Sequence, residues 1–418
     1  MNTNPQPRKE GPFDWWRSAS AEARRALWAA ALGWMLDSFD VMLYAMVLAT
    51  LMSGLGMGKS TAGLLGSLTL VASAFGGVIF GFVADRFGRR PALVGSILIY
   101  SVFTAACGLS TTILMLAVFR VLLGLGMGGE WASGAALVSE TWPPAHRGKA
   151  LGLVQSAWAV GYAAAAAVSA VVLPAWGWRA VFFVGVVPAF LTLWIQSRVK
   201  EPEIWKARRT ARGPERPDLR RIFGKGRLRL TLLVTAMNAC TLFAWWGLNL
   251  WIPAYLSMNA GEGGVGLGLS PMTGLVIFMQ VGMWLGYVSF GFISDDIGRK
   301  KAYVGFLVSA ALFVFLYAST RQPFWLLVLG PFVAFFGTGH FSGFGALTAE
   351  IYPTSIRATA QGITYNAGRI VSAAAPFVVG SLAQTWGFRF AFSVIGASFL
   401  VAAFLWIWIP ETGGRELE

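Results

Sequence analysis

The sequence predicts an all-α membrane protein in which twelve transmembrane helices form two pseudo-symmetric bundles of six. Hydrophobic residues make up 56% of the 418 residues and charged residues only 12%, far from the soluble average. Apolar stretches of about 20 residues, long enough to cross a ~30 Å hydrocarbon core, recur between short polar breaks. The third observation is an internal repeat, in which the second half of the chain matches the first.

The predicted spans follow one another with short connections, except for one long polar segment in the middle. Backbone polar groups in lipid must be hydrogen bonded within their own segment, so each span is expected to be a helix. The spans lie near residues 27–51, 61–83, 91–110, 112–139, 149–172, 179–199, 230–256, 271–293, 301–319, 324–350, 359–383 and 389–409. The expected organisation is an N-terminal cytoplasmic segment, a six-helix bundle, a cytoplasmic linker, a second six-helix bundle and a cytoplasmic tail, at 1–26, 27–200, 201–229, 230–410 and 411–418.

Positive charge sets the expected orientation. Of the 33 Lys and Arg residues, 27 lie on the side of the N-terminus, two lie within spans and four lie on the opposite side. Positive residues favour the cytoplasmic side, so both termini are expected there. The net charge of +14 is therefore assigned to contact with anionic lipid of the bilayer, and no nucleic acid is expected as a partner.

The internal repeat has a constant offset of 210 residues. GFVADRFGRRPA (81–92) matches GFISDDIGRKKA (291–302), and WGWR (176–179) matches WGFR (386–389). Two parallel repeats related by an axis along the membrane normal are typical of transporters that bind their substrate between the halves, near the midplane.

The paired G-x-x-x-D-R/D-x-G-R-R/K loops resemble the signature of the major facilitator superfamily, and the resemblance extends over essentially the whole chain. It implies the major facilitator fold and transport by alternating access. GWMLDSFD (33–40), RVLLGLGMGGEW (120–131) and AWWGLNLWIPAYL (244–256) further resemble the sialate- and lactate/pyruvate-type proton symporters, with the aromatic-acid proton symporters close behind. This implies proton-coupled uptake of an organic acid across the bacterial inner membrane, with the proton as coupling ion and no other cofactor.

Charged residues at the cytoplasmic ends of helices are expected to latch the inner gate, although they can also be ordinary topogenic charges. Asp85 stands where a carboxylate can accept hydrogen bonds from a helix N-terminus. Glu140 is expected to pair with Arg147, and the same expectation holds for the counterparts 210 residues later. The predicted gate residues are Asp85, Arg86, Arg89, Arg90, Glu140, Arg147, Asp295, Arg299, Glu350 and Arg357.

Two aspartates interrupt the apolar first span. Asp37 lies about 10 residues into it, which at ~1.5 Å per residue places this carboxyl group ~15 Å deep, near the midplane. Asp40 follows on the same helical face. An ionisable group at this depth is costly unless it meets a partner or a water-filled cavity, so both are candidates for carrying the coupling proton. One of the two can instead have a structural role, hydrogen bonding across helices.

A guanidinium group is predicted at the same depth. Arg369 lies about 10 residues into the eleventh span, and it can hold a carboxylate through two parallel hydrogen bonds. It is therefore expected to bind an organic anion, unless it pairs permanently with an acid such as Asp37. Polar and aromatic side chains are expected to complete the site. The predicted substrate-binding residues are Arg369, Asn366, Tyr365, Gln155, Tyr162, Asn249 and Gln280.

Three further ionisable residues lie within spans. Arg120 and Glu130 belong to the glycine-rich fourth span, which resembles the superfamily's fourth-helix pattern, whose arginine has been associated with proton coupling. The repeat aligns Glu130 with His340, and a histidine can change its charge near neutral pH. Arg120, Glu130 and His340 are therefore predicted coupling residues, with structural pairing as the alternative.

The predicted function is a proton-coupled symporter that imports a small organic anion, a monocarboxylate, and works as a monomer. A proton-coupled antiporter that exports drugs or lipophilic cations is one alternative, although it would favour buried acids without a midplane arginine. A receptor that binds its ligand without transport is another. The sequence contains no metal-ligand cluster, nucleophile elbow or phosphate-binding loop in a suitable context, so neither an enzyme nor a metal site is expected.

Overall fold

Long helices account for the fold. The computed structural model describes residues 14–17, 19–143, 146–203, 224, 227–352 and 357–413, so most of the predicted linker lies outside the described residues. The N-terminal half contains α1 (Asp14–Arg17), α2 (Ala21–Leu55), α3 (Lys59–Phe87), α4 (Arg89–Cys107), α5 (Ile113–Thr141), α6 (Arg147–Val184) and α7 (Val187–Arg198). The C-terminal half contains α9 (Leu228–Ser257), η3 (Ala260–Glu262), α10 (Leu269–Ile297), α11 (Arg299–Ser319), α12 (Pro323–Gly339), η4 (His340–Gly343), α13 (Phe344–Ile351), α14 (Arg357–Ser372), α15 (Ala375–Thr385) and α16 (Gly387–Leu405).

Among the described residues, ten helical stretches are long and apolar enough to cross a membrane. One of them, Arg147–Arg198, contains two passes, because Gly177 has a left-handed backbone conformation (φ 76°) that interrupts α6. A further pass consists of α14 and α15, which a short turn after Ser372 separates. Together these account for the twelve predicted passes.

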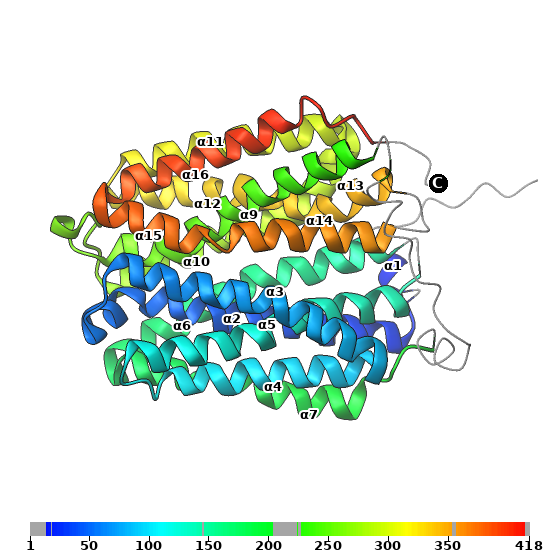
Figure 1. The fold of residues 1–418 in the computed structure, drawn as a ribbon, viewed down its shortest axis with the longest axis horizontal. Helices are drawn as coiled ribbons and strands as arrows, with labels where there is room; N and C mark the ends of the chain where they lie inside the picture. Colours follow the sequence, from blue (N-terminus) through cyan, green and yellow to red (C-terminus); the bar gives the residue numbers. More distant parts are fainter. Residues whose placement is uncertain are drawn as a thin grey trace, which may run out of the picture.

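The two halves repeat the same packing. In the N-terminal half, α3 packs against α5 and α2 against α6, and the equivalent pairs in the C-terminal half are α10 with α12 and α9 with α14. Gly88 (φ 121°) and Gly298 (φ 95°), 210 residues apart, precede α4 and α11 with the same positive φ. Figure 1 shows the halves as two layers, with α9 to α16 above α2 to α7.

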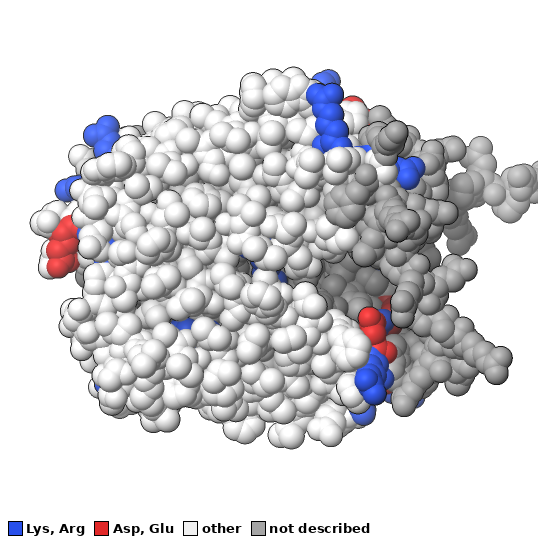
Figure 2. Space-filling view, in the orientation of Figure 1, with Lys and Arg blue, Asp and Glu red and all other residues white. Residues whose placement is uncertain are grey.

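The flank of the molecule is apolar, as a lipid-facing surface must be. In Figure 2 the Lys, Arg, Asp and Glu side chains gather at the two ends, and the broad surface between the ends is nearly free of them. Large apolar side chains on the surface include Val78, Leu114 and Phe292, each at least 70% exposed. The chain is thus a multi-pass membrane protein. Its halves meet along α6 with α10, α3 with α15 and α2 with α9, which leaves an interface where a substrate can bind.

Candidate functional site

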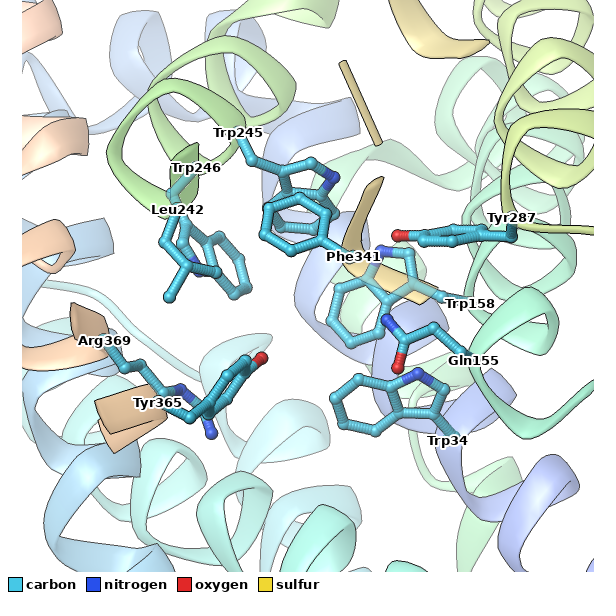
Figure 3. Close-up of a pocket in the computed structure, with 10 residues that line it drawn as sticks. All are labelled: Trp34, Gln155, Trp158, Leu242, Trp245, Trp246, Tyr287, Phe341, Tyr365 and Arg369. Carbon is cyan, nitrogen blue, oxygen red and sulfur yellow. The ribbon is translucent and has the colours of Figure 1, made fainter. Parts of the chain in front are cut away.

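A pocket lies between the two halves. Helices α2 and α6 line it from the N-terminal half, and α9, α10, η4 and α14 line it from the C-terminal half. It contains about 360 Å³ of empty space, part of which is open to solvent. The lining residues, drawn in Figure 3, are Trp34, Gln155, Trp158, Leu242, Trp245, Trp246, Tyr287, Phe341, Tyr365 and Arg369.

Two of the membrane passes that line the pocket are interrupted beside it. The tenth pass changes from α12 into the 3₁₀ turn η4, which carries Phe341 into the pocket. The eleventh pass breaks after Ser372, at the end of the helical turn that holds Arg369. Pro376 then opens α15, where its missing N–H costs nothing. Such breaks are typical of the substrate sites of secondary transporters, where irregular backbone is tolerated because it lines a cavity.

Arg369 brings a positive charge to this pocket. Its side chain is buried, and within the described part of the chain its guanidinium makes no hydrogen bond or ion pair. It interacts electrostatically with Asp37 and with Tyr365, but it does not form a salt bridge with that aspartate. Figure 3 shows Arg369 and Tyr365 across the cavity from Gln155 and Trp34. The arginine is therefore placed to bind an anion that enters between the halves.

Three buried acids lie in the N-terminal half, and one of them, Asp37, interacts electrostatically with Arg369. Asp37, Asp40 and Glu130 are each only 1% exposed. Both carboxylate oxygens of Glu130, and Oδ2 of Asp37, have no hydrogen-bond partner among the described residues, whereas Asp40 interacts with the hydroxyl group of Thr104. Asp37 interacts electrostatically with both other acids as well as with Arg369. An ionised carboxylate without a partner is costly in such surroundings, so the charge of this group must be balanced by protons or by the arginine.

None of the five predicted coupling residues lines the pocket, neither the three acids nor the two bases. Arg120 is buried on α5, with its Cζ atom 3.9 Å from the centre of the Tyr44 ring. His340 opens η4 and packs against the ring of Phe341, with the ring centres 4.4 Å apart. Neither ring nitrogen of His340 has a hydrogen-bond partner in the described structure. Phe341 thus connects this histidine with the pocket by packing alone.

Four predicted substrate-binding residues also lie outside the pocket. Tyr162 donates a hydrogen bond across the halves to the carbonyl oxygen of Asn249 (2.9 Å). Asn249 donates its own amide to the carbonyl of Trp245 (3.0 Å) and lines a smaller neighbouring cavity. Gln280 and Asn366 donate to carbonyl oxygens within their own helices (3.2 and 2.9 Å). Sequence spacing does not show how each helix is rotated about its axis, which decides whether a side chain faces the pocket.

The sequence-based set of binding residues omits the tryptophans that form most of the pocket wall. Tryptophan is common at membrane interfaces, so its presence in a span is a weak signal. A better signal for a tryptophan in the site is its helical spacing from a candidate polar residue. Trp34 precedes Asp37 by three residues, and Trp158 follows Gln155 by three.

Known proteins of similar sequence are transporters. The family model described as Major Facilitator Superfamily matches residues 30–291 and 278–417. The chain belongs to the Major Facilitator Superfamily. It is 30% identical to a sialic acid transporter of Escherichia coli, over 92% of this chain and 93% of that protein. It is 31% identical to the cis,cis-muconate transport protein of Acinetobacter baylyi, over 96% and 95% of the two chains.

A solved major facilitator structure has the same fold. The xylose transporter of E. coli, in a partially occluded inward-open conformation, matches with a TM-score of 0.77 and 20% identity over 95% of this chain and 100% of that one. The predicted all-α major facilitator fold is therefore confirmed, and the chain is a transporter and not an enzyme. Its bacterial relatives also confirm the predicted location in the inner membrane.

On the cytoplasmic side of this major facilitator, Arg89 organises the N-terminal half. Its guanidinium pairs with Asp85 and with both oxygens of Glu140 (2.8 and 3.2 Å). The backbone N–H groups of Arg89 and Arg90 donate to the carboxylate of Glu201 (2.9 and 2.8 Å). Glu201, and not Asp85 as predicted, therefore caps the N-terminus of α4, because Asp85 is held by the arginine side chain.

The C-terminal half repeats this arrangement. Arg299 pairs with Asp295 and with Glu350 (3.1 Å). A carboxylate after the last span, Glu411, accepts hydrogen bonds from the backbone N–H groups of Arg299 and Lys300 (2.9 and 3.0 Å). Glu411 lies 210 residues after Glu201, so the sequence repeat contained a signal for both caps.

The Glu411 carboxyl group has an unusually low pKa. Burial alone would raise its pKa, but hydrogen bonds from the backbone N–H groups of Gly413, Lys300, Arg299 and Thr412 outweigh this effect and lower it below the ordinary value. The cap is therefore ionised at neutral pH and complements the positive end of α11.

The predicted pairing within the second gate loop is wrong for the N-terminal half. Glu140 pairs with the arginine that opens α4, while Arg147 donates through Nε to the carbonyl oxygen of Trp142 (3.0 Å). The longer reach across to the neighbouring helix gives Glu140 a bidentate partner, which a residue in its own loop does not offer. For Glu350, the predicted partner Arg357 has a side chain outside the described part of the structure.

Ion pairs described on the cytoplasmic side join residues of the same half. Arg86, at the end of α3, lies over the ring of its neighbour Phe87, with Cζ 5.6 Å from the ring centre. Arg90 donates to the carbonyl oxygens of Gln196 and Val199, which also belong to its own half. Each of these contacts therefore stabilises a single bundle.

Hydrogen bonds at the outer end do cross between the halves. Lys59 donates to the carbonyl oxygen of Glu262 (2.6 Å), and the backbone N–H of Ser60 donates to the side chain of Gln384 (2.9 Å). Gly63 lies so close to α15 that a Cβ atom there would be 2.2 Å from the carbonyl oxygen of Pro376. These contacts hold the two halves together at the outer end.

Proposed function

We propose that this transporter imports a small organic anion, a monocarboxylate, together with a proton. The observation that carries the proposal is the buried guanidinium of Arg369, which lines the pocket and has no hydrogen-bond partner among the residues that the structure describes. A carboxylate that enters the pocket would satisfy these donors by a bidentate pair. The sialic acid and cis,cis-muconate transporters that resemble the chain are named for acids, which supports an acidic substrate here too.

The proton would be exchanged at Asp37. When the pocket is empty, Arg369 balances the charge of an ionised Asp37, with which it interacts electrostatically. When a substrate anion pairs with the arginine, Asp37 loses that compensation and takes up a proton. Anion and proton would then cross the membrane together as the two bundles rock about the site, within a single monomer.

Two other activities fit the site less well. An exporter of lipophilic cations would need a pocket that attracts positive charge, whereas Arg369 repels it. A receptor would bind an acid and then transport nothing. A measurement of uptake, rather than of binding alone, therefore distinguishes the symporter from the exporter and from the receptor.

The test is uptake of radiolabelled benzoate, a monocarboxylate, into proteoliposomes with an alkaline interior. We expect accumulation driven by the pH gradient, and we expect Asp37→Asn to abolish it while sparing exchange of internal for external acid. Asp296→Asn, a change of an exposed aspartate on the cytoplasmic side, is the matched control. Accumulation that survives in Asp37→Asn would remove Asp37 from the proposal, and transport of cations without acids would replace it by the antiporter.

A further inference from the structure

The pocket wall is an aromatic cage centred on Trp158. The Trp158 ring lies 4.6 Å from that of Trp34, 5.4 Å from that of Trp245 and 6.0 Å from that of Trp246, measured between ring centres. The cage thus joins α2 and α6 of one half with α9 of the other. Flat aromatic faces offer their best contact to a flat ligand, because a planar π-system can stack on them or meet their edges.

The cage also contains hydrogen-bond donors without acceptors. The indole N–H groups of Trp34, Trp158 and Trp245 are buried, and none has a partner among the described residues. A buried donor without an acceptor destabilises the fold, so three of them in one pocket call for an explanation. An oxygen atom of a bound ligand would supply the missing acceptor. Packing of the rings alone would be served equally well by phenylalanine, which has no donor.

The donors and the arginine stand on different sides of the cavity. In Figure 3, Arg369 and Tyr365 lie on one side, and Trp158, Gln155 and Trp34 lie on the other. A ligand whose carboxylate pairs with Arg369 would therefore extend toward the side of the cavity that holds Trp158 and Trp34.

We infer that the cage selects planar, conjugated carboxylic acids that carry a second oxygen acceptor remote from the carboxylate, with the Trp158 N–H as a specificity-determining donor. This inference rests on the proposed function, because it assumes that Arg369 holds the carboxylate. It goes further by excluding saturated acids of equal charge and by assigning the tryptophans a role in recognition.

The experiment compares matched acids by competition against labelled substrate in proteoliposomes containing the full chain. Benzoate against cyclohexanecarboxylate tests planarity, and hydroxybenzoates against the corresponding methylbenzoates test the second acceptor. We expect the wild-type protein to prefer the planar acid and the hydroxylated acid, each by about 3- to 10-fold. Trp158→Phe keeps an aromatic ring but removes the donor, so it should abolish the preference for the hydroxyl group and leave the preference for planarity.

Two further variants keep the test decisive. Trp245→Phe removes a second indole donor, from the C-terminal half, and it replaces Trp158→Phe in the test if that variant fails to fold. Trp131→Phe is the control, because Trp131 packs on Trp34 (ring centres 4.6 Å apart) without lining the pocket, and it should change neither preference.

The outcomes separate this inference from the proposed function. Equal competition by cyclohexanecarboxylate and benzoate would overturn the cage inference while leaving acid transport intact. An equal loss of affinity for every acid in both pocket variants would give the tryptophans a structural role and would also overturn it. Failure of every acid to bind or to be transported would remove the proposed function itself.

Discussion

Replacing Arg369 by lysine is the sharpest test of how the pocket holds its anion. Lysine keeps the positive charge next to Asp37 but offers a single ammonium group in place of the planar fork of donors. The variant should therefore lose one of two charge-assisted hydrogen bonds to the carboxylate, each contributing ~1.5–3 kcal/mol. We expect the dissociation constant for the acid to rise by about 10- to 150-fold.

The tryptophans of the pocket provide the assay. Titration of the purified protein with acid should quench or shift their fluorescence, which gives the dissociation constant directly for the wild type and Arg369→Lys. Arg389→Lys makes the same exchange at an exposed position on the outer side and should leave it unchanged. An affinity of Arg369→Lys within about twofold of the wild type would refute the reasoning, and Arg369 would then be a structural partner of Asp37.

Other predictions concern the two ends of the molecule. Gly63→Val should keep the halves apart on the outer side, so uptake should be abolished while acid binding persists. Gly274→Ala is the control and should have no effect, because a Cβ atom there meets open space. Normal uptake by Gly63→Val would disprove the close approach of the halves at this position. The pKa of Glu411 is lower in the folded state than in the unfolded state. The ionised Glu411 that caps α11 therefore stabilises the fold at pH values above the unfolded-state pKa of ~4.3, and this stabilisation is lost as the pH falls through the lower folded-state pKa. Glu411→Gln should consequently lower the thermal unfolding temperature at pH 7, and by progressively less as the pH falls below the unfolded-state pKa of ~4.3. A difference that does not change with pH would contradict the cap. Arg89→Gln should cost ~1–3 kcal/mol of unfolding free energy in denaturant titration, because it leaves the half-buried Glu140 without its bidentate partner, and an unchanged midpoint would show that the pair contributes nothing.

Much of the fold could be predicted because a membrane constrains a chain in only a few ways, and each constraint is visible in the sequence. Span length, the one-sided distribution of Lys and Arg and the 210-residue repeat respond to the thickness of the bilayer, its topology and the duplication of one bundle. The same repeat aligned Asp85 with Asp295 and Glu140 with Glu350, which occupy equivalent positions in the structure. The breaks beside the pocket left a weaker mark, because Ser372 and Ala373 do not by themselves disfavour a helix.

The site was only partly predictable, since it depends on helix rotation. Arg369, Tyr365 and Gln155 line the pocket as the sequence predicted, and charge or polarity within an apolar span was the signal for each. Gln280 gave the same signal but bonds within its own helix. The tryptophan cage needed side chains from α2, α6 and α9 to converge, and no spacing within one helix encodes a contact between helices far apart in the chain.

Charge balance at the site leads to a last prediction. An empty pocket with ionised Arg369 and Asp37 carries no net charge, and neither does a loaded pocket in which the anion pairs with the arginine and Asp37 holds a proton. If only the anion bound, the site would carry one uncompensated negative charge, and if only the proton bound, it would carry one positive charge. Either charge is costly in a closed intermediate without water. Uptake of a monocarboxylate should therefore be electroneutral, with one proton per anion. In proteoliposomes whose membrane potential is set with potassium and valinomycin, uptake should follow the pH gradient and ignore the voltage. Uptake that instead rises with an inside-negative potential would mean that more than one proton moves, and the second would have to be carried by Asp40 or Glu130.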